Sequence, residues 1–93
     1  MNEGYRIRFA PREEGVEYRD DTGVYRFSAL LEGRVWTVDL PCWKGDPHYE
    51  KHHLSDEERQ RILPRIVKFL SKVKWFGFLE MSYSVRVREL PEK

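Results

Sequence analysis

Two runs of alternating apolar and polar residues flank a Glu-Gly dipeptide near the middle of the chain. They span residues 24–31 and 34–40, and Glu32 and Gly33 lie between them. Because glycine reaches positive φ without strain, this spacing predicts a β-hairpin with a two-residue turn. The register that follows pairs apolar residues on one face: Ala29 with Trp36, Phe27 with Val38 and Tyr25 with Leu40. The other face then pairs Ser28 with Thr37 and Arg26 with Asp39.

Three further alternating runs predict the rest of a sheet. Residues 15–19 precede the hairpin through a turn at 20–23, and this register sets Val16 beside Phe27, Tyr18 beside Tyr25 and Glu17 beside Arg26. Residues 5–9 and 83–88 alternate in the same way at the two ends of the chain. We expect five antiparallel strands with one apolar face and one face in water.

One amphipathic helix remains to cover the apolar face. Ser55 and Glu58 form a capping box, which marks the helix start. An apolar stripe at helical spacing follows: Ile62, Ile66, Phe69, Leu70 and Val73.

The end of this helix is set by a glycine. Gly77 predicts a Schellman-type end, so that the helix runs from about Asp56 to about Trp75. Pro64 lies inside it and cannot donate a backbone hydrogen bond, so we expect a kink or a break there.

These elements define an α+β, two-layer fold. An antiparallel sheet of about five strands, a β-meander plus a C-terminal strand, packs on one long helix. The chain has 93 residues, which leaves room for a single domain over residues 1–93. Such a fold class implies nothing about activity.

The charge balance excludes a strongly basic protein. Lys and Arg number 17 against 16 Asp and Glu, a net charge of +1, which argues against electrostatic coating of DNA. The charge is unevenly spread, because residues 55–93 carry nine basic and six acidic side chains. The C-terminal half is therefore the more basic one.

The number of cysteines and the length of the apolar segments indicate the cellular compartment. Cys42 is the one cysteine, so an intramolecular disulfide is excluded. Residues 1–9 lack the apolar core of a signal peptide, and the longest uncharged apolar run, 27–31, is far short of the ~20 residues that span a bilayer. We expect a cytoplasmic protein with no membrane partner.

The segment 41–54 holds the cysteine, Trp43 and all three histidines. An irregular connection of this length is uncommon unless it has a function. Asp46 and Pro47 form a helix-start signal, and a helix there would set His48 and His52 on one face.

Two kinds of chemistry are conceivable in this segment. Cys42, His48 and His52, with Asp46 or His53 as a fourth ligand, are acceptable zinc donors. Their spacing fits no established metal pattern, and the sequence shows neither an orienting group nor an oxyanion pocket for a cysteine nucleophile. We therefore expect no metal, no cofactor and no catalysis, and keep a zinc or cysteine enzyme as the weakest reading.

A basic stripe runs along the predicted helix. At about 100° per residue, its four cations fall within roughly 60° of one another: Arg61, Arg65, Lys68 and Lys72. Arginines at 6, 8, 86 and 88 add a second row on the outer sheet face if the first and last strands are neighbours. Such patches attract phosphates or acidic proteins, although a solvated helix face also collects cations.

Tryptophans give a further indication of a binding surface. The alternating pattern places Trp36 on the apolar face and predicts that it belongs to the core, whereas Trp43 can lie on either face of the sheet. Trp75 lies beside the basic stripe, where it is exposed unless the helix frays and turns it back onto the sheet. Exposed tryptophan beside arginine is typical of binding hot spots.

We therefore predict a small, non-enzymatic interaction module that binds a partner protein. The expected contact residues lie on the aromatic and histidine loop and on the helix: Trp43, His48, Tyr49, His52, Arg61, Arg65, Lys68, Lys72 and Trp75. Nucleic-acid or phosphate binding through the helix stripe is the alternative. Monomer and homodimer both remain open.

Overall fold

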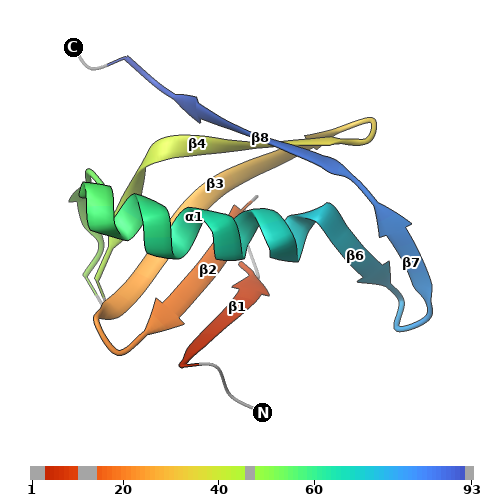
Figure 1. Cartoon of the computed structure of the whole chain (residues 1–93), viewed down its shortest axis with the longest axis horizontal. Coiled ribbons are helices and arrows are strands. Elements are labelled where there is room, and N and C mark those ends of the chain that lie inside the picture. The colour runs from red at the N-terminus through yellow and green to blue at the C-terminus, as the bar shows by residue number, and fades with distance from the viewer. Residues whose placement is uncertain (1–3, 11–14, 46–47, 92–93) are drawn as a thin grey trace.

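The computed structural model describes residues 4–10, 15–45 and 48–91, and Figure 1 shows one helix lying across a twisted sheet. In chain order the elements are β1 (Tyr5–Phe9), β2 (Gly15–Asp20), β3 (Gly23–Glu32), β4 (Val35–Lys44), β5 (Glu50–His52), α1 (Asp56–Ser71), β6 (Lys72–Trp75), β7 (Leu79–Ser82) and β8 (Ser84–Glu89). The predicted α+β class, a meander with one helix packed on a mostly antiparallel sheet, is confirmed.

Strands β1 to β4 form the expected antiparallel meander. The predicted register between β2 and β3 is confirmed, with Val16 opposite Phe27 and Glu17 opposite Arg26. The register between β3 and β4 differs from the prediction by two residues, because Ala29 lies opposite Val38 and Leu31 opposite Trp36. An even shift leaves every side chain on its predicted face, since side chains alternate with a period of two.

The position of the turn accounts for this shift, and a bulge adds a further one beyond it. Glu32 pairs with Val35, so the two turn residues are Gly33 and Arg34. The bulge lies between Arg26 and Ser28, and it sets Arg26 opposite Trp43. The predicted pair of Arg26 with Asp39 is therefore wrong, and Arg88 of β8 forms an ion pair with the Asp39 carboxylate instead.

The far edge of β4 is shared by two strands. Its C-terminal part pairs antiparallel with β5, and its N-terminal part, from Val35 to Leu40, pairs with β8. This last pairing is parallel, so the expectation of antiparallel strands throughout is wrong for β8. It also places β8 far from β1, and the predicted row of Arg6 and Arg8 with Arg86 and Arg88 does not form.

Helix α1 begins as predicted and ends early. Ser55 caps it, with the Ser55 hydroxyl accepting from the Glu58 N–H and the Glu58 carboxylate accepting from the Ser55 N–H. Pro64 lies inside one continuous helix, so the chain does not break there. Lys72 has φ −145° and ψ 109°, an extended conformation that ends the helix after Ser71.

The segment expected to be the last helical turns is a hairpin of β6 and β7. Val73 lies opposite Met81 and Trp75 opposite Leu79. The Phe78 N–H donates to the Trp75 carbonyl oxygen, which closes a tight turn. The predicted Schellman end at Gly77 is therefore wrong, because Gly77 belongs to this turn.

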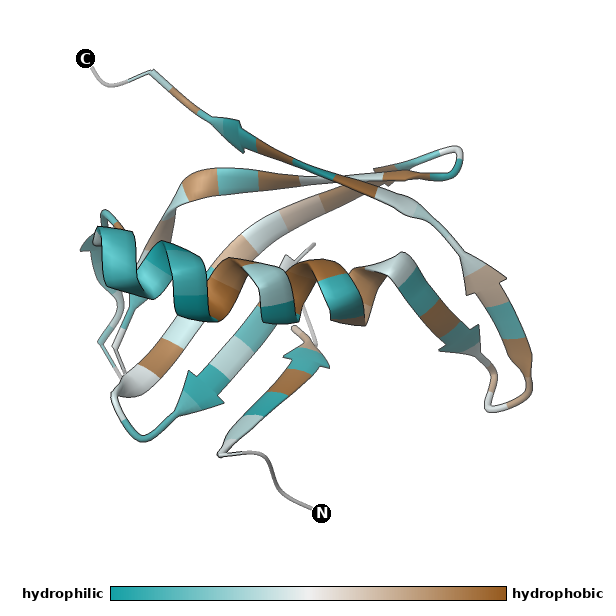
Figure 2. Cartoon of the chain, in the orientation of Figure 1, coloured by the Kyte–Doolittle hydropathy of each residue, from teal (hydrophilic) through white to brown (hydrophobic). Residues whose placement is uncertain are grey.

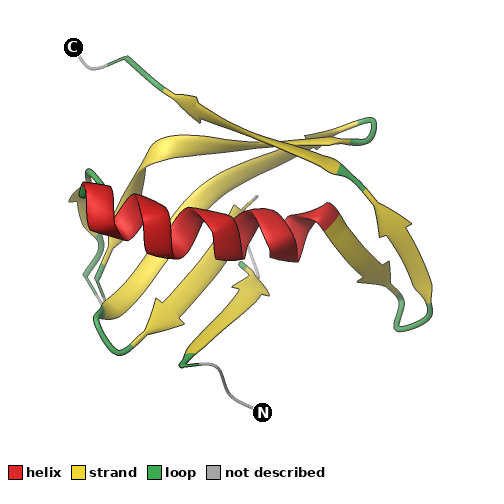
Figure 3. Ribbon diagram, in the orientation of Figure 1, coloured by secondary structure: helices red, strands yellow, loops and turns green. Residues whose placement is uncertain are grey.

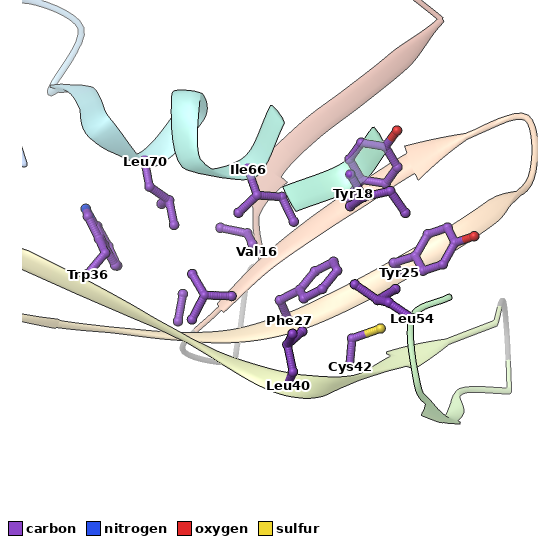
Figure 4. Packing of buried hydrophobic residues seen from close by; sticks show 13 residues of the cluster. Val16, Tyr18, Tyr25, Phe27, Trp36, Leu40, Cys42, Leu54, Ile66 and Leu70 are labelled. Carbon is purple, nitrogen blue, oxygen red and sulfur yellow. The ribbon is translucent and has the colours of Figure 1, made fainter. Parts of the chain in front are cut away.

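The core lies between α1 and the inner face of the sheet. Figure 4 shows Ile66 and Leu70 of the helix pointing toward Val16 and Phe27 of the sheet. Figure 2 shows the corresponding apolar bands along the strands and the helix. Trp36 is buried in this cluster, as the alternating pattern predicted.

Candidate interaction surfaces

The predicted contact residues do not form one surface. Trp43 and Tyr49 gather on the outer face of the sheet, His52 and Arg61 join a polar network at the start of α1, and Arg65, Lys68 and Lys72 line a groove beside β1. The helix start expected at residues 46–47 lies outside the described residues. Residues 50–52 form a strand, so His48 and His52 do not share a helix face.

On the outer face, Trp43 and Tyr49 flank Arg26. Trp43 is 46% exposed and lies opposite Arg26, whose guanidinium carbon is 4.5 Å from the centre of the Tyr49 ring. The same guanidinium bonds to Glu17, which also accepts from Arg8 and is only 4% exposed. The hydrogen bond from Arg8 lowers the pKa of Glu17 and keeps this carboxylate ionised.

At the start of α1, Glu58 is the centre of a polar network. The Tyr25 hydroxyl donates to it at 2.8 Å, His52 Nε2 lies 3.0 Å away, and Lys44 Nζ is at 3.9 Å. Burial alone raises the pKa of Glu58, but the hydrogen bonds from Ser55, Tyr25 and His52 outweigh it and hold the pKa at about 2.

Arg61 lies at the same end of the molecule, where two carboxylates neutralise its charge. It forms ion pairs with Asp20 of β2 and with Glu57 one turn earlier on the helix. Its charge is therefore compensated, which removes one cation from the predicted basic stripe.

Cys42 is buried under the sheet. Burial raises the pKa of its thiol to about 12, so the reactive thiolate is not formed near neutral pH. Within residues 4–10, 15–45 and 48–91, no group of three His, Cys, Asp or Glu side chains is arranged to hold a metal ion.

A groove of about 290 Å³ is lined by residues of α1 and β1 and by Lys72 of β6. In Figure 1 the ribbon of the helix lies above that of β1. The apolar floor of the groove consists of Tyr5 and Ile7 of β1 and Phe69 of α1, and its cations are Arg65, Lys68 and Lys72. The Arg65 guanidinium stacks 4.3 Å from the centre of the Tyr5 ring and donates to the Tyr18 hydroxyl. Lys68 and Lys72 are exposed and form no ion pair with the residues that the structure describes.

The groove opens onto the free edge of β1. This strand pairs with β2 and with no other described strand. The Ala10 N–H donates to the Gly15 carbonyl oxygen, and in an antiparallel pair the hydrogen-bonded positions alternate. Arg8 and Arg6 therefore bond to β2, whereas Tyr5, Ile7 and Phe9 turn their backbone N–H and C=O groups away from the sheet.

Trp75 takes the second of its two expected positions, turned back onto the sheet. Its ring lies 6.2 Å from that of Phe9, and its Nε1 donates to the Tyr83 hydroxyl. It is half-buried and serves to dock the β6–β7 hairpin on the core.

Three residues that line the groove were not predicted as contacts: Tyr5, Ile7 and Phe69. The alternation of residues 5–9 and the apolar stripe of the helix assign these three side chains to the apolar interior, but neither pattern shows that β1 lies at an edge. The β6–β7 hairpin was not predicted either, because the helix was expected to run to about Trp75. The alternation of Lys72-Val73-Lys74-Trp75 before Phe76-Gly77 is the signal that indicates a hairpin there.

Comparisons with known proteins give no relative. The chain matches no protein-family model, and comparisons with curated proteins and with solved structures find no significant similarity. No helix within the described ranges combines the length and the apolar character needed to cross a membrane.

Proposed function

We propose that this protein is an interaction module that binds an extended, acidic segment of a partner protein along β1. The observation that carries this proposal is the groove beside a strand edge with free backbone groups. The bound segment adds to the sheet as a further strand, and its backbone bonds to Tyr5, Ile7 and Phe9. The proposal includes a cytoplasmic setting, in keeping with the buried free thiol of Cys42.

The two faces of the added strand meet different surroundings. Alternate side chains point toward the groove, where an apolar floor lies beside Lys68 and Lys72. The intervening side chains lie on the outer face beside Arg6, which is exposed and forms no ion pair with the described residues. Acidic side chains on both faces, with small apolar ones between them, fit this arrangement best.

The same geometry favours a protein segment over a nucleic acid. Arg61 is neutralised by Asp20 and Glu57, and Arg65 is held by Tyr5 and Tyr18. Two free lysines beside a strand edge suit a short acidic peptide, whereas a polynucleotide needs a longer cationic track.

Fluorescence anisotropy with a labelled peptide that repeats two glutamates followed by two valines tests this proposal, because such a strand carries glutamate and valine in turn on each of its faces. We expect binding that weakens as salt rises, and Lys68→Glu should weaken it about tenfold because it places a like charge at the groove. Lys51→Glu is the matched control, since Lys51 is an exposed lysine of β5 far from β1. A single-stranded oligonucleotide that binds while the peptide does not overturns the proposal in favour of a nucleic-acid partner.

A separate variant and a hydrogen-exchange measurement test the role of the strand edge. Ile7→Pro removes an outward N–H at a position where proline is tolerated on edge strands, so it should abolish peptide binding while the far-UV circular dichroism stays unchanged. In the wild-type chain, the peptide should slow hydrogen exchange at the Ile7 amide. Peptide binding that leaves this amide unprotected contradicts strand addition.

A further inference from the structure

The tip of the β6–β7 hairpin exposes two phenylalanines that the groove does not use. Phe76 is 86% and Phe78 79% exposed, and the neighbouring Leu79 is 47% exposed. The hairpin forms a two-stranded sheet of its own and extends beyond the end of the main sheet, at the right of Figure 1. Side chains this apolar are normally withdrawn from water, so their exposure here points to contact with another apolar phase.

The backbone of Phe76 shows that the turn itself does not need this residue. Phe76 has φ 55° and the following Gly77 has φ 81°, both in the left-handed region. Asn or Gly adopts the first of these positions with little strain, whereas a bulky aromatic residue is disfavoured there. The aromatic side chain of Phe76 therefore strains the turn rather than stabilising it.

Charge is distributed unevenly between the two ends of the molecule. Near the hairpin lie Lys68 in the last turn of α1, followed by Lys72 and Lys74 on β6, with Glu80 opposite Lys74. At the far end, three acidic residues occupy the first turn of α1, but cations accompany them: Arg61 pairs with Asp20 and Glu57, and Lys44 Nζ lies 3.9 Å from the Glu58 carboxylate. Within the described residues, Lys68, Lys72 and Lys74 form no ion pair, so an anionic surface attracts the hairpin end more than the other end.

We propose that this tip anchors the protein to an anionic lipid membrane by inserting Phe76 and Phe78 into the interfacial layer. Aromatic rings are suited to the headgroup region, and adjacent lysines are attracted to acidic lipids. A protruding convex tip enters a deformable lipid layer without a preformed pocket. The expectation of no membrane partner rested on the lack of a spanning segment, and an interfacial tip needs none.

Vesicle co-sedimentation tests this proposal. The wild-type chain should bind vesicles of phosphatidylcholine with phosphatidylserine, and bind vesicles of pure phosphatidylcholine at least about tenfold more weakly. Phe76→Ser with Phe78→Ser should reduce binding about tenfold or more, because it removes the apolar contact. Lys74→Glu should reduce it about fivefold or more, whereas Lys51→Glu should have little effect.

Phe76→Gly separates this role from a structural one. Glycine relieves the left-handed strain, so the melting temperature should stay the same or rise while vesicle binding falls. A melting temperature that drops in parallel with binding overturns the proposal. A wild-type chain that fails to bind the anionic vesicles also overturns it and leaves an apolar protein pocket as the occupant of the tip.

The two sites can be tested independently. The serine double variant should retain binding of the glutamate–valine peptide, and Ile7→Pro should retain binding to anionic vesicles. Failure of the peptide experiment therefore leaves the membrane proposal standing, and failure of the vesicle experiment leaves the peptide proposal standing.

Discussion

At the scale of single residues, Glu58 joins three parts of the fold. It caps α1 through the Ser55 N–H, accepts from Tyr25 of β3 and contacts His52 of β5. All of these contacts favour the ionised carboxylate, which explains a pKa of about 2 despite burial. Folding is therefore linked to the ionisation of this one group.

Stability should consequently fall in acid. The pKa of Glu58 is about 2 in the folded chain, against an ordinary value of 4.5, so its contribution is complete above pH 4.5 and is lost as the pH falls through 2. We expect Glu58→Gln to lower the unfolding free energy at pH 7 by about 2 kcal/mol and to flatten its dependence on pH in this range. Urea unfolding at pH 7, 5 and 3 measures both effects.

Glu57→Gln is the control for this variant. Glu57 lies in the same helical turn as Glu58 and forms an exposed ion pair with Arg61, so its neutralisation should change the unfolding free energy by no more than about 0.5 kcal/mol. If wild type and Glu58→Gln lose stability in parallel between pH 5 and 3, another carboxylate governs the acid sensitivity.

At the scale of elements, Pro64 weakens α1 from within. Proline has no N–H, so the Gln60 carbonyl oxygen loses its helical donor, and the pyrrolidine ring crowds the preceding turn. Pro64 is exposed, so little packing is lost when it is replaced. We expect Pro64→Ala to raise the unfolding free energy by about 1–2 kcal/mol, as measured by urea denaturation.

Val67→Ala offers a comparison in the same helix. Val67 is half-buried, and its truncation should destabilise the fold rather than stabilise it. Equal or lower stability of Pro64→Ala contradicts the expectation and means that the helix is already adapted to the proline.

The end of α1 shows where sequence patterns become ambiguous. Val73 fits both the helical stripe and the alternation of a strand, and Trp75 fits the strand alone. A short run cannot distinguish the two periods, so the long helical stripe before it led to the wrong choice. The capping box had no such ambiguity, and the start of α1 was predicted correctly.

The register of β3 against β4 is ambiguous for a related reason. An alternating pattern specifies which face a side chain occupies, and shifts by two residues leave that face unchanged. Gly33 fits either position of a two-residue turn, so the turn could not resolve the register. The inward positions of Phe27, Trp36 and Val38 were accordingly predicted correctly, while their partners across the β3–β4 pair were not.

At the scale of the whole molecule, the sequence gives no sign of the order of the outer strands. The parallel pairing of β4 with β8 connects residues separated by the helix and the hairpin, and no local pattern encodes that contact. The groove depends on it, because β8 takes the edge of β4 and leaves β1 open at the other side. The cations of the groove were thus predictable from the helix pattern, whereas its apolar floor was not.

The same pairing makes β8 necessary for the fold. Tyr83 and Val85 pack against the core, and β8 covers the edge of β4 from Val35 to Leu40. A chain ending at Ser82 leaves that edge and the Trp36 ring exposed, which should remove most of the ~5–10 kcal/mol of a small domain's stability. We expect no cooperative thermal transition for it by circular dichroism, whereas a chain ending at Pro91 should unfold as the full chain does. If the shorter chain still unfolds cooperatively, the meander and α1 form a stable core by themselves, and β8 is an accessory strand.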